Sequence, residues 1–438
     1  MEAKTVYANP SISALVAVVS ALVEGRTVTP VETDEQKMER LLELHTSILP
    51  LSSRPAQAVS PDNFVVLLTG STGSLGSYIL DTLLGNPHVS AVYCLNRGPN
   101  SSKRQLASQS AKGLPPPSPT KAHFLDGDLS KPYFGLSTQD YKTLLSSVTT
   151  IIHNAWQVDF NLSIDSFSKQ LSGVRRFVEF SSHSRFAASI FFVSSIGAVG
   201  NWTAVTGRAS DVPEAIYQDW NVPQPIGYSQ SKFVAERILD TVAREADVPT
   251  VVCRVGQIAG PTTEEGIWPP QEWLPSLVAS SKYLGKLPTS LGLMGVVDWI
   301  PVDVLGRGIV ELALNKGDYA KKASDGATVY HAVNVQRAEW SRLVGTIATV
   351  LQEAGGKKIE LVSLEEWVNA LRESASLTED MGINPAIKIM DTYVGMAAGK
   401  GRPMSLDTKN TVAVSKALAG SEAVNEALVK NWLRQWAF

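Results

Sequence analysis

The chain has 438 residues, of which 44% are hydrophobic and 18% are charged, a composition typical of a globular protein with a large core. Its formal net charge of -3 argues against a nucleic-acid-binding protein, because those proteins usually carry an excess of basic residues. No segment resembles a secretory signal or is apolar for long enough to span a bilayer. We therefore expect roughly two to three domains in a reducing, cytoplasmic setting, with the two cysteines as buried free thiols.

The first sixty residues differ in pattern from those that follow. Residues 7–23 contain an apolar run after an Asn-Pro pair, and residues 35–49 form an amphipathic run; both predict helices. Residues 51–61 are rich in serine, proline and alanine, which is typical of a linker. We therefore expect residues 1–60 to form an N-terminal helical segment with a linker.

From residue 61 to residue 260, short apolar runs alternate with segments of helical length. The runs that predict strands are residues 65–68, 91–95, 122–125, 150–152, 190–193 and 251–253. Continuous apolar strands separated by helices are typical of a parallel sheet that is covered on both faces. The predicted fold class is therefore α/β, a Rossmann-type doubly wound parallel sheet.

After residue 260 this alternation is lost. Tryptophan-rich and helical segments predict a smaller C-terminal substrate-binding domain over residues 261–438. Segments within residues 296–335 are candidates for a return to the larger domain, with residues 328–335 as a strand of its sheet.

Three glycines follow the first predicted strand and open the next helix. Gly70, Gly73 and Gly76 have the spacing at which a tight turn, bare backbone and close helix packing allow a pyrophosphate to approach the helix N-terminus. A turn that only reverses the chain is the alternative. The predicted cofactor-binding loop consists of Gly70, Ser71, Thr72, Gly73, Ser74, Leu75 and Gly76.

The end of the second predicted strand bears on which dinucleotide would bind. An enzyme that uses NAD usually has an acidic residue there, whereas an arginine suits the 2′-phosphate of NADP. This chain has Arg97 there, with Lys103 and Arg104 close behind and no acidic residue at the position. Arginine binds phosphate through a charged, bidentate pair of hydrogen bonds. The pattern favours NADPH, with a solvated basic loop as the alternative.

Tyr228 and Lys232 are the only Tyr-x-x-x-Lys pair in the chain. They open an amphipathic helical run, so both side chains lie on one helix face. A lysine ammonium there should lower the tyrosine pKa from about 10 towards neutrality, as suits a proton donor to a developing alkoxide. A surface pair without catalytic function is the alternative.

A hydroxyl at the end of an intermediate strand would complete such a site. Ser195 is the preferred candidate and Ser194 the second, with the function of hydrogen-bonding the substrate oxygen. Asn154 and Ala155, at the end of another strand, suit contact with the cofactor, whereas the adjacent His153 is given no catalytic function. The histidines and cysteines form no metal-binding motif, so no metal is predicted.

These motifs together resemble the extended short-chain dehydrogenase/reductase family. Four further segments look like the C-terminal thioester reductase domains of fungal adenylate-forming reductases, nonribosomal peptide synthetases, polyketide synthases and aminoadipate reductase. They are residues 128–132 (DLSKP), 153–161 (HNAWQVDFN), 254–261 (RVGQIAGP) and 297–303 (VDWIPVD). The likeness covers residues 64–303. Gln157 departs from it, because such domains often have proline there. Val255 also departs, because the wider reductase family often has proline after the arginine. Both departures bear on the shape of the pocket.

The resemblance implies a mechanism in which NADPH delivers a hydride to a thioester carbonyl. Tyr228, with Lys232 and Ser195, would stabilise and protonate the oxygen, and the hemithioacetal would collapse to an aldehyde and a thiol. A second reduction to the alcohol is left open. The resemblance also implies that Asp128 and Leu129 contact the cofactor and that Lys232 holds the nicotinamide ribose.

Residues 7–15 (YANPSISAL) also look like the last helix of a carrier domain, although the attachment-site motif of such a carrier is absent. This likeness implies a phosphopantetheinyl carrier domain as the partner that presents the acyl thioester. The chain would then be a monomeric part of a larger multidomain enzyme. An ordinary N-terminal helix is the alternative.

Other functions fit the same fold. The substrate could be a free ketone, an acyl-CoA or a nucleotide sugar, the last as in epimerases and dehydratases. A sensor that binds NADPH without turnover is disfavoured, because both Tyr228 and Lys232 are present. Trp268, Trp273 and Trp299 either shape a channel for the acyl or pantetheine group or pack as an aromatic core.

Overall fold

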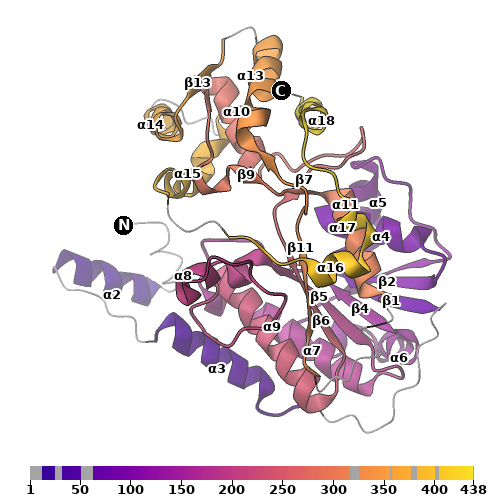
Figure 1. Cartoon of the computed structure of the whole chain (residues 1–438). Helices are drawn as coiled ribbons and strands as arrows, with labels where there is room; N and C mark the ends of the chain where they lie inside the picture. Colours follow the sequence, from indigo (N-terminus) through magenta and orange to yellow (C-terminus); the bar gives the residue numbers. More distant parts are fainter. Residues whose placement is uncertain are drawn as a thin grey trace.

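The computed structural model describes residues 12–24, 32–50, 63–315, 317, 325–355, 358–375, 382–399 and 404–437. The predicted linker at residues 51–61 and most of the carrier-like stretch at residues 7–15 lie outside these ranges. Within them the chain forms a larger sheet domain and a smaller, mainly helical domain, which lies above it in the view of Figure 1. No helix among these residues is long and apolar enough to cross a membrane.

A seven-stranded sheet forms the centre of the larger domain, and all of its strand pairs are parallel. Its order is β11-β6-β5-β4-β1-β2-β3. The strands are β1 (Phe64–Thr69), β2 (Val89–Arg97), β3 (Ala122–Gly127), β4 (Thr150–His153), β5 (Ser189–Ser195), β6 (Thr250–Val255) and β11 (Thr328–Ala332). Each of the six apolar runs predicted as strands falls within one of β1 to β6, and the predicted Rossmann-type fold class is confirmed.

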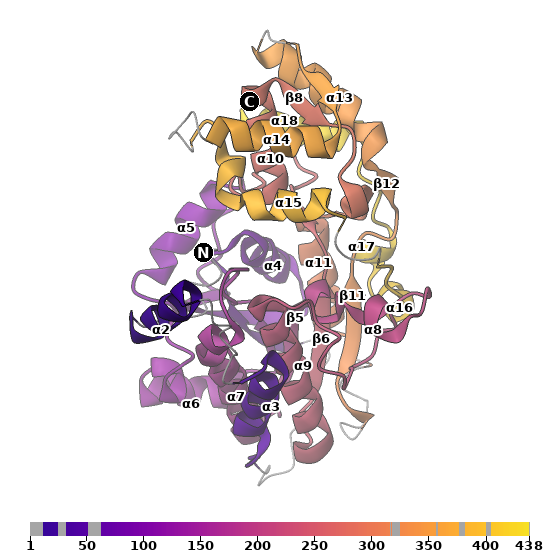
Figure 2. The same ribbon diagram turned by 90° about the vertical axis from the view of Figure 1, so that its left-hand side faces the viewer.

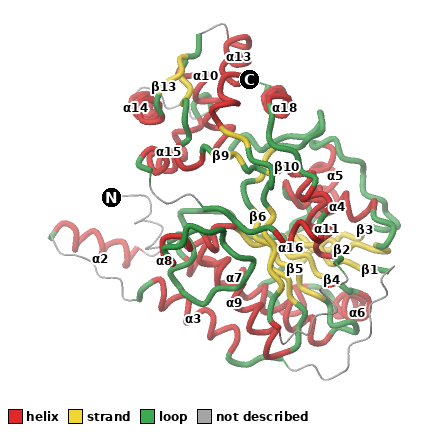
Figure 3. The backbone as a smooth tube through the Cα atoms, in the orientation of Figure 1, coloured by secondary structure: helices red, strands yellow, loops and turns green. Residues whose placement is uncertain are grey.

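Helices cover both faces of this sheet, as Figure 3 shows. Successive side chains of a strand point to opposite faces; in β1, Leu67 joins one core cluster, while Val66 and Leu68 join the other. One face is covered by α6 (Thr138–Ser147), α7 (Ser168–His183) and α9 (Gly227–Ala246), and the other by α4 (Ser74–Gly85), α11 (Val302–Ala313) and α17 (Lys416–Ala419). Burial on both faces explains why the strands are continuous apolar runs in the sequence.

The helix α3 (Asp34–Thr46) belongs to this packing, although the sequence pattern predicts a separate N-terminal segment there. Met38 and Leu41, about one turn apart, are buried in the same cluster as residues of α7 and α9. Figure 2 shows α3 alongside these two helices. The preceding α2 (Ile12–Val23) instead exposes part of its apolar surface, with Val23 82% exposed.

The smaller domain is built from segments that follow β7 (Ile258–Ala259), and it has its own core. Its helices and strands are α10 (Trp273–Leu284), β8 (Lys286–Pro288), β9 (Val296–Val297), β12 (Ala338–Glu339), α13 (Trp340–Gly355), β13 (Glu360–Val362), α14 (Leu364–Ala375), α15 (Met390–Ala397) and α18 (Glu426–Trp436). The ring of Trp268 lies edge-on to those of Trp299 and Trp432, with centroid distances of 5.8 and 5.1 Å. Trp268 and Trp299 are 1% and 2% exposed, so core packing accounts for both.

The chain passes back and forth between the two domains. After β9, both α11 and β11 lie with the large sheet, and β11 pairs with β6 at its edge. Later, α16 (Lys409–Val414) and α17 contact the larger domain before α18 packs in the smaller one. Further elements are α5 (Ser101–Ser110), α8 (Trp202–Thr206), β10 (Ile300–Pro301) and the short 3-10 helices η1 (Pro132–Gly135), η2 (Ile164–Phe167), η3 (Ile196–Val199), η4 (Gly292–Met294) and η6 (Pro385–Ile389).

A buried ion pair joins the sheet to α9. Arg254 of β6 and Glu236 of α9 have side chains that are 0% and 1% exposed, and Nη2 of the arginine lies 2.7 Å from a carboxylate oxygen. Burying two charges is costly unless their other hydrogen-bonding positions are also satisfied. Glu236 also accepts a hydrogen bond from Ser194 of β5, and Arg254 donates to His331 of β11 and to the Ala215 carbonyl. The pair therefore holds three strands and α9 together.

His331 makes this cluster dependent on pH. Its Nε2 accepts a hydrogen bond from Arg254 and its Nδ1 donates one to the Asp407 carbonyl, at 3.2 and 2.7 Å. Burial, and next the arginine charge, lower the pKa of His331 to about 3. Because this folded-state pKa is below the unfolded value of about 6.5, the unfolded chain takes up the proton first as the pH falls. The stability that neutral His331 contributes is therefore complete above about pH 6.5 and is lost as the pH falls towards 3.

We predict that His331→Gln, which cannot ionise but keeps one donor and one acceptor, makes the free energy of unfolding less sensitive to acid. As the pH falls below about 6.5, the wild type should lose more stability than the variant, by up to about 1.4 kcal/mol per pH unit, the limit for one additional proton. Urea unfolding followed by circular dichroism at several pH values measures the difference. Equal pH slopes for the two proteins would contradict this function of His331.

Candidate active site

The glycine loop lies where the strand order of the sheet reverses, between β1 and β4. Ligands of doubly wound sheets bind in the crevice at this point. Gly70 has a φ of +71°, and a Cβ on Gly76 would lie 2.0 Å from the Gly70 carbonyl oxygen. Gly73 precedes α4 as its N-cap and has no side chain to occupy the helix N-terminus. The loop therefore fits the pyrophosphate of a dinucleotide, because bare backbone and the start of a helix face the place where it would lie.

Hydrogen bonds fasten this loop to β4. The Thr69 hydroxyl oxygen accepts from the backbone N–H groups of Asn154 and Ala155, at 3.1 and 3.0 Å. Since both acceptor positions are then used, the hydroxyl donates its own proton to Nδ1 of His153, 2.9 Å away. Burial, and next the charge of Lys232, lower the pKa of His153 to about 3, so this histidine is neutral and serves the structure of the loop.

Side chains from α5 and β2 hold the other side of the loop. Asn96 at the end of β2 donates a hydrogen bond to the Ser71 hydroxyl at 2.8 Å, and Ser108 of α5 donates to the Thr72 carbonyl at 2.9 Å. Ser74 starts α4, and Leu75 is buried in the core below it. The predicted cofactor-binding residues thus form a turn from Gly70 to Gly73 and the first turn of α4 from Ser74 to Gly76, and hydrogen bonds hold this turn in place.

The two arginines predicted to bind the cofactor are Arg97, the last residue of β2, and Arg104 of α5, and their side chains have different partners. Arg104 donates to the carbonyls of Arg97 and Gly98, at 2.7 and 3.3 Å, and so braces the backbone there. The Arg97 side chain lines a cavity of about 320 Å³ together with Lys131 and Asp128. Sequence reasoning did not select Lys131, although its place just after the third strand puts it at the same sheet edge as Arg97.

Two carboxylates at the end of β3 are already engaged by hydrogen bonds. Asp126 accepts from the backbone N–H groups of Asn100 and Ser101 at the start of α5, each at 3.0 Å. Asp128 accepts from the N–H and hydroxyl of Ser130, at 3.0 and 2.7 Å. Hydrogen bonds from Ser101 and Ser130 are the main reasons why the pKa of each carboxyl lies below its usual value. The neighbouring Leu129 packs against α7, close to Gly173.

The first two turns of α9 carry Tyr228 and Lys232. Lys232 is 3% exposed, and its Nζ donates to the Val193 carbonyl at 2.6 Å. The same atom lies 4.3 Å from the ring centroid of Trp156 and 4.5 Å from that of Phe192. Burial lowers the pKa of Lys232 well below its usual value, and the charge of Glu236 opposes this shift.

The expected lowering of the Tyr228 pKa is wrong for this structure. Burial raises the pKa of Tyr228 to about 12, and a hydrogen bond with Ser195 opposes this only in part. The Lys232 ammonium lies 5.9 Å from the centre of the phenol ring and donates to Val193, while the rings of Phe160 and Phe167 pack edge-on against Tyr228. The desolvation of a tyrosinate therefore sets the direction of the shift. Tyr228 stays protonated at neutral pH, as a proton donor must be.

The two serines at the end of β5 point to different partners. Ser194 is 3% exposed and donates to Glu236 at 2.5 Å, so its hydroxyl is part of the buried ion-pair cluster. Ser195 is half-buried, accepts from the Gly197 N–H at 3.1 Å and bonds with Tyr228. The structure thus brings Ser195, Tyr228 and Lys232 together, whereas the Ser194 hydroxyl is engaged by Glu236.

Comparison with known proteins identifies relatives along the chain. Residues 68–309 match the male sterility protein family of NAD-binding domains. The chain is 38% identical over 440 residues to a carboxylic acid reductase of Neurospora crassa, an alignment that covers 99% of this chain and 41% of that protein. The chain therefore spans about two fifths of the length of this relative.

Two solved structures share the fold. The terminal R domain of the myxalamid PKS-NRPS biosynthetic pathway has a TM-score of 0.74 and 21% identity, covering 92% of this chain and 97% of that one. A thiolation-reductase di-domain of an archaeal non-ribosomal peptide synthetase has a TM-score of 0.65 and 19% identity, covering 98% and 85%. At these identities the likeness concerns the fold alone.

We predict that Gly76→Ala abolishes nicotinamide-cofactor binding, because its methyl group would overlap the Gly70 carbonyl and displace the loop. Gly85→Ala is the matched control: it is the same substitution at the last residue of α4, where an added Cβ has no neighbour within 4 Å. Titration of cofactor fluorescence measures both affinities. Unchanged binding by Gly76→Ala would show that the cofactor does not depend on this loop.

Proposed function

The chain belongs to the male sterility protein family of NAD-binding domains, and on this premise we propose that it is an NADPH-dependent reductase that releases a carrier-bound acyl thioester as an aldehyde. The observation that carries the proposal is the placement of Ser195, Tyr228 and Lys232 at the carboxyl end of the sheet, beside the glycine loop. The carboxylic acid reductase among the relatives supports the same reaction class.

The residues of α9 and β5 would act on the substrate oxygen. The glycine loop would hold the pyrophosphate of a reduced dinucleotide, whose nicotinamide would supply a hydride. Tyr228, protonated because of its raised pKa, would give its proton to the carbonyl oxygen, and Ser195 would hold that oxygen. The Lys232 ammonium would then compensate the negative charge left on the tyrosine. Cleavage of the carbon–sulfur bond of the resulting hemithioacetal would leave an aldehyde and a free thiol, with no covalent acyl-enzyme.

An apolar surface lies beside the proposed proton donor. Val158 and Phe160 follow β4 and are 67% and 58% exposed, and the Phe160 ring packs edge-on to Tyr228 with a centroid distance of 5.2 Å. Such a surface suits the apolar part of an acyl group. Gln157, which departs from the resembling families, accepts a hydrogen bond from Gln170 at 3.1 Å through its amide oxygen.

The choice of NADPH over NADH rests on the cavity beside β2 and β3. Arg97 and Lys131 are its two basic residues, and a 2′-phosphate would find both charges there. Asp126 lines the same cavity, but its carboxylate already accepts two backbone hydrogen bonds and is less available to a ribose hydroxyl. Arg104 would act indirectly, through the backbone that it braces.

A phosphopantetheinyl carrier domain is the proposed partner. The matched carboxylic acid reductase is more than twice as long as the matched region, and one of the similar structures joins a thiolation domain to a reductase domain. The carrier-like sequence at residues 7–15 supports the same arrangement. The two cysteines, Cys94 and Cys253, are buried and free, which suits the proposed cytoplasmic setting.

We expect the protein to oxidise NADPH when it is given acyl-pantetheine thioesters, with an aldehyde or alcohol and a free thiol as products. Tyr228→Phe should lower kcat by roughly 10²- to 10⁴-fold, the usual contribution of a general acid, while NADPH still binds. Absorbance of NADPH, thiol titration and product identification by mass spectrometry measure these effects. Turnover of ketones or nucleotide sugars, with none of any thioester, would contradict the proposal.

Arg97→Ala tests the cofactor choice. Loss of a charged hydrogen bond to the 2′-phosphate should raise the KM for NADPH by roughly 10- to 100-fold and leave the KM for NADH nearly unchanged. Lys103→Ala is the matched control, because Lys103 is an exposed basic residue of the same segment and does not line the cavity. An equal effect of Arg97→Ala on both cofactors would argue against a 2′-phosphate site.

A further inference from the structure

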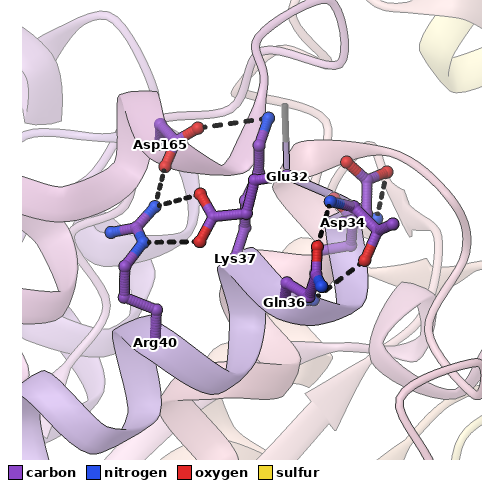
Figure 4. A network of polar contacts seen from close by, with 8 residues as sticks. Glu32, Asp34, Gln36, Lys37, Arg40 and Asp165 are labelled. Atoms are coloured by element: carbon purple, nitrogen blue, oxygen red, sulfur yellow. Dashed lines mark hydrogen bonds and ion pairs between the residues drawn. The ribbon is translucent and has the colours of Figure 1, made fainter. Parts of the chain in front are cut away.

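The helix α3 is bonded to both segments of the chain that surround Tyr228. Figure 4 shows the polar network at its N-terminal end. Asp34 joins α3 to α9, and Lys37 and Arg40 join it to η2. These contacts link residues about 125 to 196 positions apart in the sequence.

The start of α3 is fixed by its own sequence. Thr33 and Gln36 form a reciprocal capping box, with the Gln36 N–H donating to the Thr33 hydroxyl and the Thr33 N–H donating to the Gln36 side chain, at 3.2 and 2.9 Å. At the other end, Arg175 of α7 donates to the His45 carbonyl at 3.0 Å. With Met38 buried between these ends, α3 has a defined position on the sheet domain.

The hydrogen bond of Asp34 reaches α9 next to Tyr228, the proposed proton donor. Gln230 is 4% exposed, and its Nε2 donates to Asp34 Oδ2 at 2.9 Å. Gln230 lies two residues after Tyr228, within the first turn of α9. The hydrogen bond therefore fixes the N-terminal end of α9. The ion pair of Glu236 lies about two turns further along the helix and holds this end less directly.

The second link reaches the segment that packs on the tyrosine ring. Asp165 of η2 accepts from Arg40 at 2.8 Å and pairs with Lys37 at 3.3 Å. Phe167, in the same short helix, packs edge-on against Tyr228 with a centroid distance of 6.4 Å. A Cβ on Gly227 would lie 2.3 to 2.6 Å from the backbone of residues 162–164, so η2 and the start of α9 are in direct backbone contact.

We propose that α3 is a positioning element of the active site: Asp34, through Gln230, and Lys37 with Arg40, through Asp165, align the Tyr228 hydroxyl with the substrate oxygen. The inference rests on the proposed reductase function. None of these residues needs to touch the substrate, because each acts on a neighbour of Tyr228 along the chain. Misalignment of a reacting group lowers the rate of the chemical step without weakening the binding of a cofactor held elsewhere.

Three variants of the full chain separate positioning from helix stability. Asp34→Ala removes the acceptor of the Gln230 hydrogen bond. Glu35→Ala is the matched control: it removes the neighbouring exposed acidic residue of the same first turn, and so the same interaction with the helix dipole. Asp34→Asn removes the charge but keeps an oxygen that can accept from Gln230, and should restore the activity.

We expect Asp34→Ala to lower kcat on an acyl-pantetheine thioester by about 3- to 10-fold, as for one lost hydrogen bond, with the affinity for NADPH unchanged. Glu35→Ala and Asp34→Asn should stay close to the wild type. Hydrogen exchange followed by mass spectrometry should show faster exchange in residues 160–167 and 227–233 of Asp34→Ala only. This second measurement needs no substrate.

Equal kcat and equal exchange in Asp34→Ala and Glu35→Ala would overturn the positioning function of α3. A parallel loss of kcat and of melting temperature in both variants would also overturn it, since helix stability alone would explain the result. If the wild type reduces no thioester, the proposed function fails, whereas the exchange measurement still decides whether α3 orders the segments around Tyr228.

Discussion

The buried ion pair between Arg254 and Glu236 is the interaction on which the arrangement of the site depends. It places a charged side chain of α9 against the sheet at one fixed position, with hydrogen bonds from β5 and to β11 completing the cluster. Lys232 and Tyr228 lie one and two turns earlier on the same helix face. Any rotation of α9 about its axis would bring Glu236 out of reach of Arg254, so the pair also sets where the two proposed catalytic residues point.

Burial of this helix face shifts the pKa values of Tyr228 and Lys232 in opposite directions. It raises the pKa of Tyr228 and lowers that of Lys232, since in both cases the charged form is disfavoured. The Lys232 Nζ lies at the Val193 carbonyl and at the faces of two aromatic rings, a setting that favours the ammonium form and opposes the effect of burial. The protonated phenol is the state from which Tyr228 can donate a proton to a substrate oxygen.

The fold could be predicted from the sequence because its signals are local. The six predicted strands are mainly apolar runs, interrupted only by His123 and Thr150, and the glycine spacing between the first strand and its helix depends on the backbone alone. The position of α3 could not be predicted, because its partners Gln230 and Asp165 are far away in the sequence. For the same reason the choice between Ser194 and Ser195 needed the position of Glu236, and the direction of the Tyr228 pKa needed the burial of its ring.

The segment that follows β4 connects the cofactor side of the site to its catalytic side. His153 accepts from Thr69 at the start of the glycine loop, while its ring packs edge-on against Trp156 with a centroid distance of 5.8 Å. Trp156 in turn lies beneath the Lys232 ammonium and donates from its indole N–H to Ser231 at 3.2 Å. A change in the glycine loop can therefore reach Lys232 through two aromatic rings. These contacts explain why the four residues after β4 include small, polar and aromatic side chains. The backbone of Asn154 and Ala155 must bond to the glycine loop, and the indole of Trp156 must pack against Lys232.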